Sequence, residues 1–257
     1  MRLTTLRLPD DTMCLVPTGG EREARYVYHE VFDHAEYLEH WLELPANATV
    51  IDVGAHIGLF TLFVKRACPT ATVVAFEPMP PTLTALLGNI ELHDLRQVTV
   101  HRNALGSHHE DAVTFTYYPE IPANSTRYPD RKDHDRKLVT QLAGVDRAQR
   151  MYVHQQFTVS VDRLSSFLRP PAVAERIDLL KVDVEGAELD VLAGIDEADW
   201  RRVDRVIVEV QDVDGQLGAV IGVLARHGFA TTVKESSSLP PEFRLRLVFG
   251  ANTSARP

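Results

Sequence analysis

The chain has 257 residues, with 27 Lys and Arg against 36 Asp and Glu, which gives a formal charge of −9 at pH 7. A dedicated nucleic-acid binder needs clustered cations to neutralise phosphates, so this balance argues against that class. Hydrophobic residues make up 44% of the chain and charged residues 25%, which is typical of a globular protein and not of a disordered one. Charged residues interrupt every long apolar run, so we expect no membrane span.

The N-terminal residues 1–8 alternate between polar and apolar side chains. This pattern predicts a strand and lacks the continuous apolar region of a signal peptide, so we expect a cytoplasmic protein. Cys14 and Cys68 show no metal-binding spacing, and a disulfide between them is not expected in a reducing compartment.

Residues 1–46 are predicted to form an N-terminal extension. Turn-forming residues at 9–11 and 18–20 separate short strands. The residues over 32–44, followed by Pro45, predict a helix that ends at the proline.

A repeating order of strands and helices begins at residue 49 and predicts an α/β domain. Apolar runs predict strands at 49–53, 72–76, 98–100, 177–184 and 205–210. Helical spacing of apolar residues predicts helices after residue 58, over 83–90, over 186–195 and over 217–224. The last two predicted strands, 229–233 and 243–249, are joined without a helix and should therefore pair antiparallel. No linker or repeat is evident, so we expect 1–257 to be a single domain.

The order of strands and helices is interrupted by an insertion at residues 107–155. Strand patterns at 113–117 and 156–161 flank residues 118–137, which contain three prolines and a dense run of mixed charge. Two interpretations stay open, a solvated surface loop and a lid over a binding site. In the second case we expect the segment to be mobile without substrate.

A glycine-containing turn follows the strand at 49–53 and precedes a helix. Glycines allow a close backbone approach, and a helix N-terminus favours negative charge. Glu77 ends the next strand, where a carboxylate can accept hydrogen bonds from both ribose hydroxyls, so we expect an adenosine-containing ligand. The spacing Gly54-x-x-x-Gly58 differs from the Gly-x-Gly-x-x-Gly that cradles a pyrophosphate, which favours a cofactor without phosphate.

A second group of charged residues lies in and after the strand at 177–184. Lys181 and Asp183 are two residues apart and share one face of that strand. Charged groups inside a parallel sheet are costly unless they are paired or lie at the carboxyl edge, where such folds bind ligands. Lys181 is thus either half of a buried ion pair or part of a reaction site. Glu185 either takes part in the chemistry or complements a helix dipole, and Glu209 ends the neighbouring strand.

The chain resembles the FkbM family of S-adenosylmethionine-dependent methyltransferases over about residues 37–210. Four motifs carry the resemblance, namely residues 52–58 (DVGAHIG), 76–78 (FEP), 103–106 (NALG) and 180–188 (LKVDVEGAE). The resemblance implies a class I methyltransferase sheet, Rossmann-like, with seven strands of which the last is antiparallel. His56 is a departure, because the family often has Asn there, and this puts a contact to the methionine end of the cofactor in doubt.

The resemblance also implies roles for particular residues. The ribose would lie on Glu77 and the methionine end over the glycine turn, with Asp52 assisting, Asn103 near the adenine and Tyr37 closing over the methionine end. The expected cofactor-binding residues are Tyr37, Asp52, Gly54, Ala55, His56, Gly58, Glu77, Pro78, Asn103 and Asp183. The expected catalytic residues are Asp183, Glu185 and Lys181.

The expected reaction is methyl transfer from S-adenosylmethionine to a hydroxyl of a small molecule, either a sugar or a polyketide or peptide natural product. An alcohol must lose its proton, so Asp183 or Glu185 is the leading base, with a histidine from residues 118–137 in reserve. A divalent cation held by Asp183 and Glu209 stays open, although no metal-ligand spacing demands it. Two alternatives remain, a non-catalytic protein that binds an adenosine cofactor and an NAD-dependent dehydrogenase. We expect neither a nucleic-acid nor a membrane partner.

Overall fold

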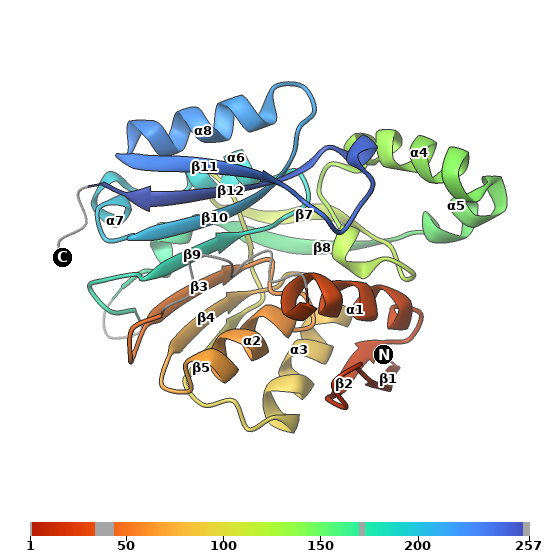
Figure 1. Ribbon diagram of the computed structural model, residues 1–257, viewed down its shortest axis with the longest axis horizontal. Coiled ribbons are helices and arrows are strands. Elements are labelled where there is room, and N and C mark those ends of the chain that lie inside the picture. The colour runs from red at the N-terminus through yellow and green to blue at the C-terminus, as the bar shows by residue number, and fades with distance from the viewer. Residues whose placement is uncertain (1, 34–43, 170–172, 254–257) are drawn as a thin grey trace.

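The computed structural model describes residues 2–33, 44–169 and 173–253. Its centre is a seven-stranded sheet with the strand order β11-β12-β10-β9-β3-β4-β5 (Figure 1). β12 is antiparallel to both of its neighbours, and the other pairs are parallel. The seven strands are β3 (Thr49–Val53), β4 (Thr72–Phe76), β5 (Val98–His101), β9 (Leu179–Val182), β10 (Arg205–Gln211), β11 (Phe229–Glu235) and β12 (Leu245–Asn252). This arrangement confirms the predicted fold class, including the antiparallel final strand.

Helices cover both faces of the sheet because successive side chains of a strand point to opposite faces. On β3, Ile51 packs into the core formed with α6 and α8, whereas Val50 packs into the core formed with α2. Both residues are fully buried. The covering helices are α2 (Leu59–Ala67), α3 (Pro80–Leu92), η4 (Leu164–Ser166), α6 (Glu188–Ala193), α7 (Glu197–Trp200) and α8 (Gln216–Arg226).

The N-terminal extension is a hairpin followed by a helix. β1 (Leu3–Arg7) pairs antiparallel with β2 (Met13–Pro17), as the alternating pattern predicts. The first helix, α1 (Glu21–Tyr28), begins well before the predicted residue 32 and continues into the π-helix η1 (His29–Asp33). Glu21 and Glu23 lie in its first turn, where acidic side chains complement the helix dipole. Most of the predicted helix at 32–44 lies outside the described residues.

The predicted strands that flank residues 118–137 form a second sheet together with residues 104–105. Residues 118–137 fold into short helices with buried side chains, so their interpretation as a solvated loop is wrong. The sheet has the order β6-β8-β7 and consists of β6 (Ala104–Leu105), β7 (Glu110–Tyr117) and β8 (Gln155–Asp162). Between β7 and β8 lie η2 (Pro122–Asn124), η3 (Pro129–Lys132), α4 (Asp133–Ala143) and α5 (Val145–Met151). A short turn, η5 (Pro241–Phe243), precedes β12. The charge run did not exclude burial, because Lys132 and Asp135 are both buried.

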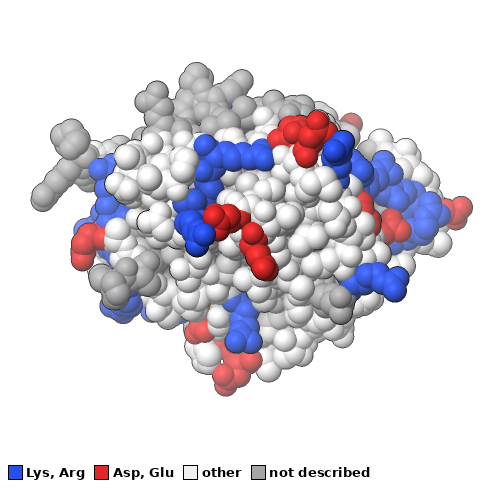
Figure 2. Space-filling view, turned by 90° about the horizontal axis from the view of Figure 1, so that it is seen from below, with Lys and Arg blue, Asp and Glu red and all other residues white. Residues whose placement is uncertain are grey.

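Charges of both signs are interspersed on the surface. On the face shown in Figure 2, Lys and Arg side chains lie beside Asp and Glu side chains in several small groups separated by uncharged areas. Within the described ranges, no helix is both long and apolar enough to cross a bilayer. Cys14 and Cys68 are buried free thiols.

Candidate active site

A cavity of about 800 Å³ lies at the carboxyl ends of the parallel strands. It is lined by the segments that follow β3, β4, β9 and β10, together with α1, η1, the insertion and the loop before β12. Loops from different strands converge at this edge, which is where open α/β sheets bind ligands. A cavity of this volume is in the range of pockets that enclose small molecules.

The turn after β3 is held against two neighbouring segments. The backbone N–H groups of Gly54 and Ala55 donate to the carbonyl of Phe76, at 3.1 and 2.9 Å. Gly54 has φ +80°, and a Cβ atom on it would lie 1.7 Å from the carbonyl oxygen of Asp183. Gly58 has φ +90°, and its Cβ would lie 2.6 Å from Leu86. A backbone contact therefore requires a glycine at position 54, whereas the positive φ favours one at position 58.

Gly54, Ala55 and His56 all line the cavity. His56 has φ +52°, an uncommon conformation for a residue with a side chain. Burial lowers the pKa of its imidazole to about 3, so the ring is neutral. Its Nε2 atom lies 3.5 Å from Oε2 of Glu23 on α1, and the same Glu23 oxygen accepts the N–H of Ala123, at 2.9 Å. Glu23 thus contacts both the glycine turn and the insertion, and it joins them to α1.

Glu77 lies at the end of β4, as predicted, and lines the cavity while only 6% exposed. Its carboxylate accepts the backbone N–H groups of His56 and Met79, at 2.9 and 2.8 Å, and the Thr82 hydroxyl, at 3.1 Å. Burial outweighs these bonds and raises the pKa of Glu77 to about 7. Pro78, which follows Glu77, also lines the cavity.

Asn103 lines the cavity as well. Its side-chain amide donates to Ser160, at 3.1 Å, and to Asp162, at 3.0 Å, both on β8. Its amide is therefore oriented by the second sheet. Glu77, Asn103 and the glycine turn together offer a buried carboxylate and an amide, which fits the ribose and base of an adenosine group.

Lys181 forms the buried ion pair that the sequence left open, and it also lines the cavity. Its Nζ atom lies 3.1 Å from Asp183 and 3.4 Å from Asp52, and donates to the Gly54 carbonyl, at 3.1 Å. Burial opposes its charge, but Asp183 and Asp52 outweigh burial and raise its pKa. Asp52 itself is fully buried and accepts the Thr61 hydroxyl, at 2.8 Å. It supports Lys181 from behind the cavity, where we expected it to assist the cofactor.

Three carboxylates converge beside Lys181. One oxygen each from Asp183, Glu185 and Glu209 lies within 4.8 Å of the others, and all three residues line the cavity. Burial and the neighbouring Asp183 carboxylate hold the pKa of Glu209 well above its ordinary value. Burial also raises the pKa of Glu185, although Lys132 opposes that rise. This acidic edge is suited to accept a proton or to hold a cation.

Three residues of the site were missed at the sequence level, namely Glu23, Glu30 and Lys132. All three are buried and line the cavity. Glu23 and Glu30 belong to an N-terminal helix that carries no motif, and Lys132 belongs to a charge run typical of exposed surface. No local pattern marks their place in the site, since Glu23 and Lys132 each bond to a residue distant in sequence, Ala123 and Glu185.

Two predicted residues remain, Tyr37 and the reserve histidine. Tyr37 lies outside the described residues. His134, the candidate reserve base, lines the cavity, and its Nε2 atom lies 3.1 Å from the carbonyl of Glu242.

The seven-stranded sheet with one antiparallel strand, and the glycine turn followed by a buried acid, define a class I S-adenosylmethionine-dependent methyltransferase. Among solved structures, the fold is similar to that of the methyltransferase FkbM from Methylobacillus flagellatus KT, with a TM-score of 0.55 and 14% identity. The match covers 83% of this chain and 46% of that one.

Two relatives are similar over nearly the whole chain. The chain is 36% identical to Methyltransferase 1 of Beauveria bassiana, over 95% of this chain and 96% of the relative. It is 38% identical to the 31-O-demethyl-FK506 methyltransferase FkbM of Streptomyces tacrolimicus, over 91% and 92%. The model of the methyltransferase FkbM domain matches residues 52–230. The chain therefore belongs to the FkbM methyltransferase family, which confirms the resemblance and argues against the dehydrogenase.

Proposed function

We propose that the protein transfers the methyl group of S-adenosylmethionine to a hydroxyl oxygen of a small, largely apolar acceptor. The observation that carries this proposal is one continuous cavity that joins the glycine turn and Glu77 to the acidic edge. The cofactor supplies an electrophilic methyl group on a sulfonium. The chain must then hold the acceptor in line and receive the proton that its hydroxyl loses.

We assign the cofactor to the part of the cavity near Glu77, with the ribose hydroxyls donating to that carboxylate. The methionine end would lie over Gly54, Ala55 and His56, and the adenine near Asn103. Calorimetry with S-adenosylhomocysteine on Glu77→Ala tests this assignment. Losing a charged acceptor should weaken binding by about 1.5–3 kcal/mol. Unchanged affinity would sink the ribose assignment.

We assign the reaction to the acidic edge. Asp183 orients or deprotonates the acceptor hydroxyl while Lys181 keeps it in place. Asp183→Asn should lower turnover by a factor of at least about 10², the lower bound for a general base, in a protein that stays folded. Near-normal turnover of that variant would assign catalysis to positioning alone.

The acceptor class is supported by the apolar part of the cavity wall. Among its side chains are the apolar groups of Val139, Leu142, Met151, Leu239 and Phe243. Such a wall favours an acceptor with an extended apolar surface over a free sugar. The name of the Streptomyces relative, a 31-O-demethyl-FK506 methyltransferase, points the same way.

Mass spectrometry on an acceptor panel tests the reaction. The panel should contain 31-O-demethyl-FK506, a glycoside and a hydroxylated peptide, and the expected product carries one additional methyl group on oxygen. Methylation of nitrogen or carbon in every product would overturn the proposal. Loss of turnover with a chelator, restored by magnesium, would add a cation bound between Asp183 and Glu209.

The extension and the insertion line the same cavity as the edge of the sheet. This shared lining supports our proposal that residues 1–257 work as one domain.

A further inference from the structure

Lys132 is buried, whereas the other cations of its charge run, residues 131–137, are exposed. Arg131, Arg136 and Lys137 are exposed, whereas Lys132 is 6% exposed and lines the cavity. Burying an ammonium group is costly unless counter-charges and hydrogen bonds compensate. Its burial therefore calls for partners inside the site.

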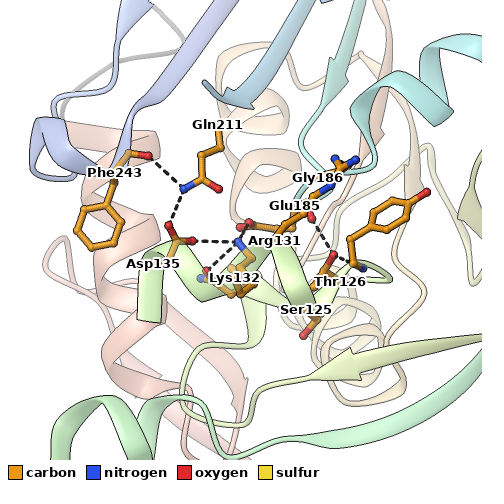
Figure 3. Close-up of polar contacts among 12 residues, drawn as sticks. Ser125, Thr126, Arg131, Lys132, Asp135, Glu185, Gly186, Gln211 and Phe243 are labelled. Atoms are coloured by element: carbon orange, nitrogen blue, oxygen red, sulfur yellow. Dashed lines mark hydrogen bonds and ion pairs between the residues drawn. The ribbon is translucent and has the colours of Figure 1, made fainter. Parts of the chain in front are cut away.

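Those partners lie on both sides of Lys132 (Figure 3). Its Nζ atom donates to the carboxylate of Glu185, lies 3.6 Å from Asp135, and donates to the side-chain oxygen of Asn124, at 3.2 Å. Burial opposes the charge, but Glu185 and Asp135 outweigh it and raise the pKa of Lys132. Glu185 also has φ +57°, a conformation that persists only where surrounding contacts hold it.

Other contacts join the same parts of the chain. The Thr126 hydroxyl donates to the carbonyl of Glu185, at 2.8 Å, and Arg131 donates to the carbonyl of Gly186. On the other side, Gln211 at the end of β10 donates to Asp135, at 2.5 Å. Figure 3 shows the insertion, the loop after β9 and the end of β10 joined in one polar network, with Lys132 at its centre.

We propose that Lys132 is a positioning residue that holds the Glu185 carboxylate at the acidic edge and keeps residues 122–135 docked beside the acceptor. The inference rests on the proposed function. Lys132 contacts neither Glu77 nor the glycine turn, which meets the insertion through Glu23 and Ala123 instead, so cofactor binding should not depend directly on Lys132. Without the lysine, the half-buried Glu185 and the buried Asp135 become two neighbouring carboxylates with no shared cation, and they should separate.

Lys132→Met tests the docking without any acceptor. Hydrogen exchange, followed by mass spectrometry, should become faster in peptides covering 122–135 and 183–188 and stay unchanged in the core strand 49–53. Affinity for S-adenosylhomocysteine should stay within a factor of about two, well below a tenfold change. Lys137→Met is the matched control, because it removes the same charge from an exposed position of the same run. Equal exchange in the two variants overturns the proposal.

Turnover measurements test whether Lys132 affects catalysis by positioning Glu185. Misplacing a catalytic group by an ångström can cost a factor of about 100 in rate. The kcat of Lys132→Met should therefore fall by up to about 100-fold, whereas the KM for S-adenosylmethionine should stay unchanged. Lys132→Arg should restore part of the rate. In the double variant Lys132→Met/Glu185→Gln, the second substitution should add little further loss, since the two groups act as a unit.

If the two substitutions lower kcat by factors that multiply in the double variant, Lys132 does not act through Glu185. Failure of the proposed function is distinguishable from these outcomes. A wild-type protein that methylates no hydroxyl acceptor while Lys132→Met still exposes 122–135 contradicts the reaction and leaves the docking role in place.

Discussion

Gly54 is the residue at which two loops of the site touch. Its positive φ costs a residue with a Cβ atom roughly 1–2 kcal/mol. The Cβ of Gly54→Ala would also lie 1.7 Å from the Asp183 carbonyl oxygen, so the end of β9 must move. We expect Gly54→Ala to lower the free energy of unfolding, measured by urea denaturation, by clearly more than the cost of the positive φ alone.

Gly215 supplies the control for this prediction. It has a similar φ of +78°, and a Cβ on it would meet nothing within 4 Å. Gly215→Ala should therefore lose only the free energy of unfolding that the positive φ costs, because no steric clash adds to it. Equal losses in the two variants would mean that the loops separate easily and that their contact does not stabilise the fold.

Among single residues of the site, those at strand ends could be predicted from the sequence. The pairs formed between residues distant in sequence could not. Glu77 and Asp183 follow strands whose apolar runs are plain in the sequence, so their place at the sheet edge follows from topology. Lys132 lies 53 residues from Glu185, and Glu23 lies 100 residues from Ala123. Pairing over such separations depends on how the insertion folds back, and a single sequence carries no signal for that.

At the scale of elements, Asn89 on α3 joins the N-terminal hairpin to the glycine turn at residues 54–58. Its buried amide donates to the carbonyls of Leu15 and Ile57, at 2.9 and 2.8 Å, and accepts the Leu15 N–H, at 2.7 Å. Asn89→Ala leaves these groups without their partner, and an unsatisfied buried polar group costs about 1–3 kcal/mol. We expect a loss of that size in urea denaturation.

Glu91→Ala is the matched control, because Glu91 lies on the same helix and is exposed. Surface substitutions usually change stability by less than about 0.5 kcal/mol. An Asn89→Ala protein as stable as this control would show that the hydrogen bonds of Asn89 do not stabilise the fold.

Elements with strong periodicity were predicted, and those shaped by tertiary contacts were not. All seven strands of the main sheet were expected from the sequence, and the central ones, which are buried on both faces, stand out as apolar runs. The helix α4 was missed because residues 131–137 are so polar. The start of α1 at Glu21 was missed because its buried face, which includes Ala24 and Tyr28, is short and partly polar.

For the molecule as a whole, Glu77 links folding to pH. Burial raises its pKa from 4.5 to about 7 in the folded chain, so the folded state keeps a proton that the unfolded state releases. The contribution of Glu77 to stability is then complete below pH 4.5 and is lost as the pH rises to about 7. The slope is about 1.4 kcal/mol per pH unit.

Comparison with Glu77→Gln isolates this slope in cofactor-free protein. His56 acts in the opposite sense, because its pKa falls from 6.5 to about 3, but it is present in both proteins. The difference in unfolding free energy, wild type minus variant, should therefore decrease between pH 4.5 and 7. A difference independent of pH would show that folding does not raise the pKa of Glu77.

The same carboxyl links cofactor binding to pH under the proposed ribose assignment. Ribose hydroxyls donate to the ionised form, so binding should lower the pKa of Glu77 from about 7 and release a proton. Affinity for S-adenosylhomocysteine should thus be full above pH 7 and decrease as the pH falls, by up to tenfold per unit. Calorimetry in buffers of different ionisation enthalpy measures the released proton directly. Glu77→Gln should bind more weakly and show no proton release near pH 7; if the variant releases as much as the wild type, another group titrates and Glu77 does not hold the ribose.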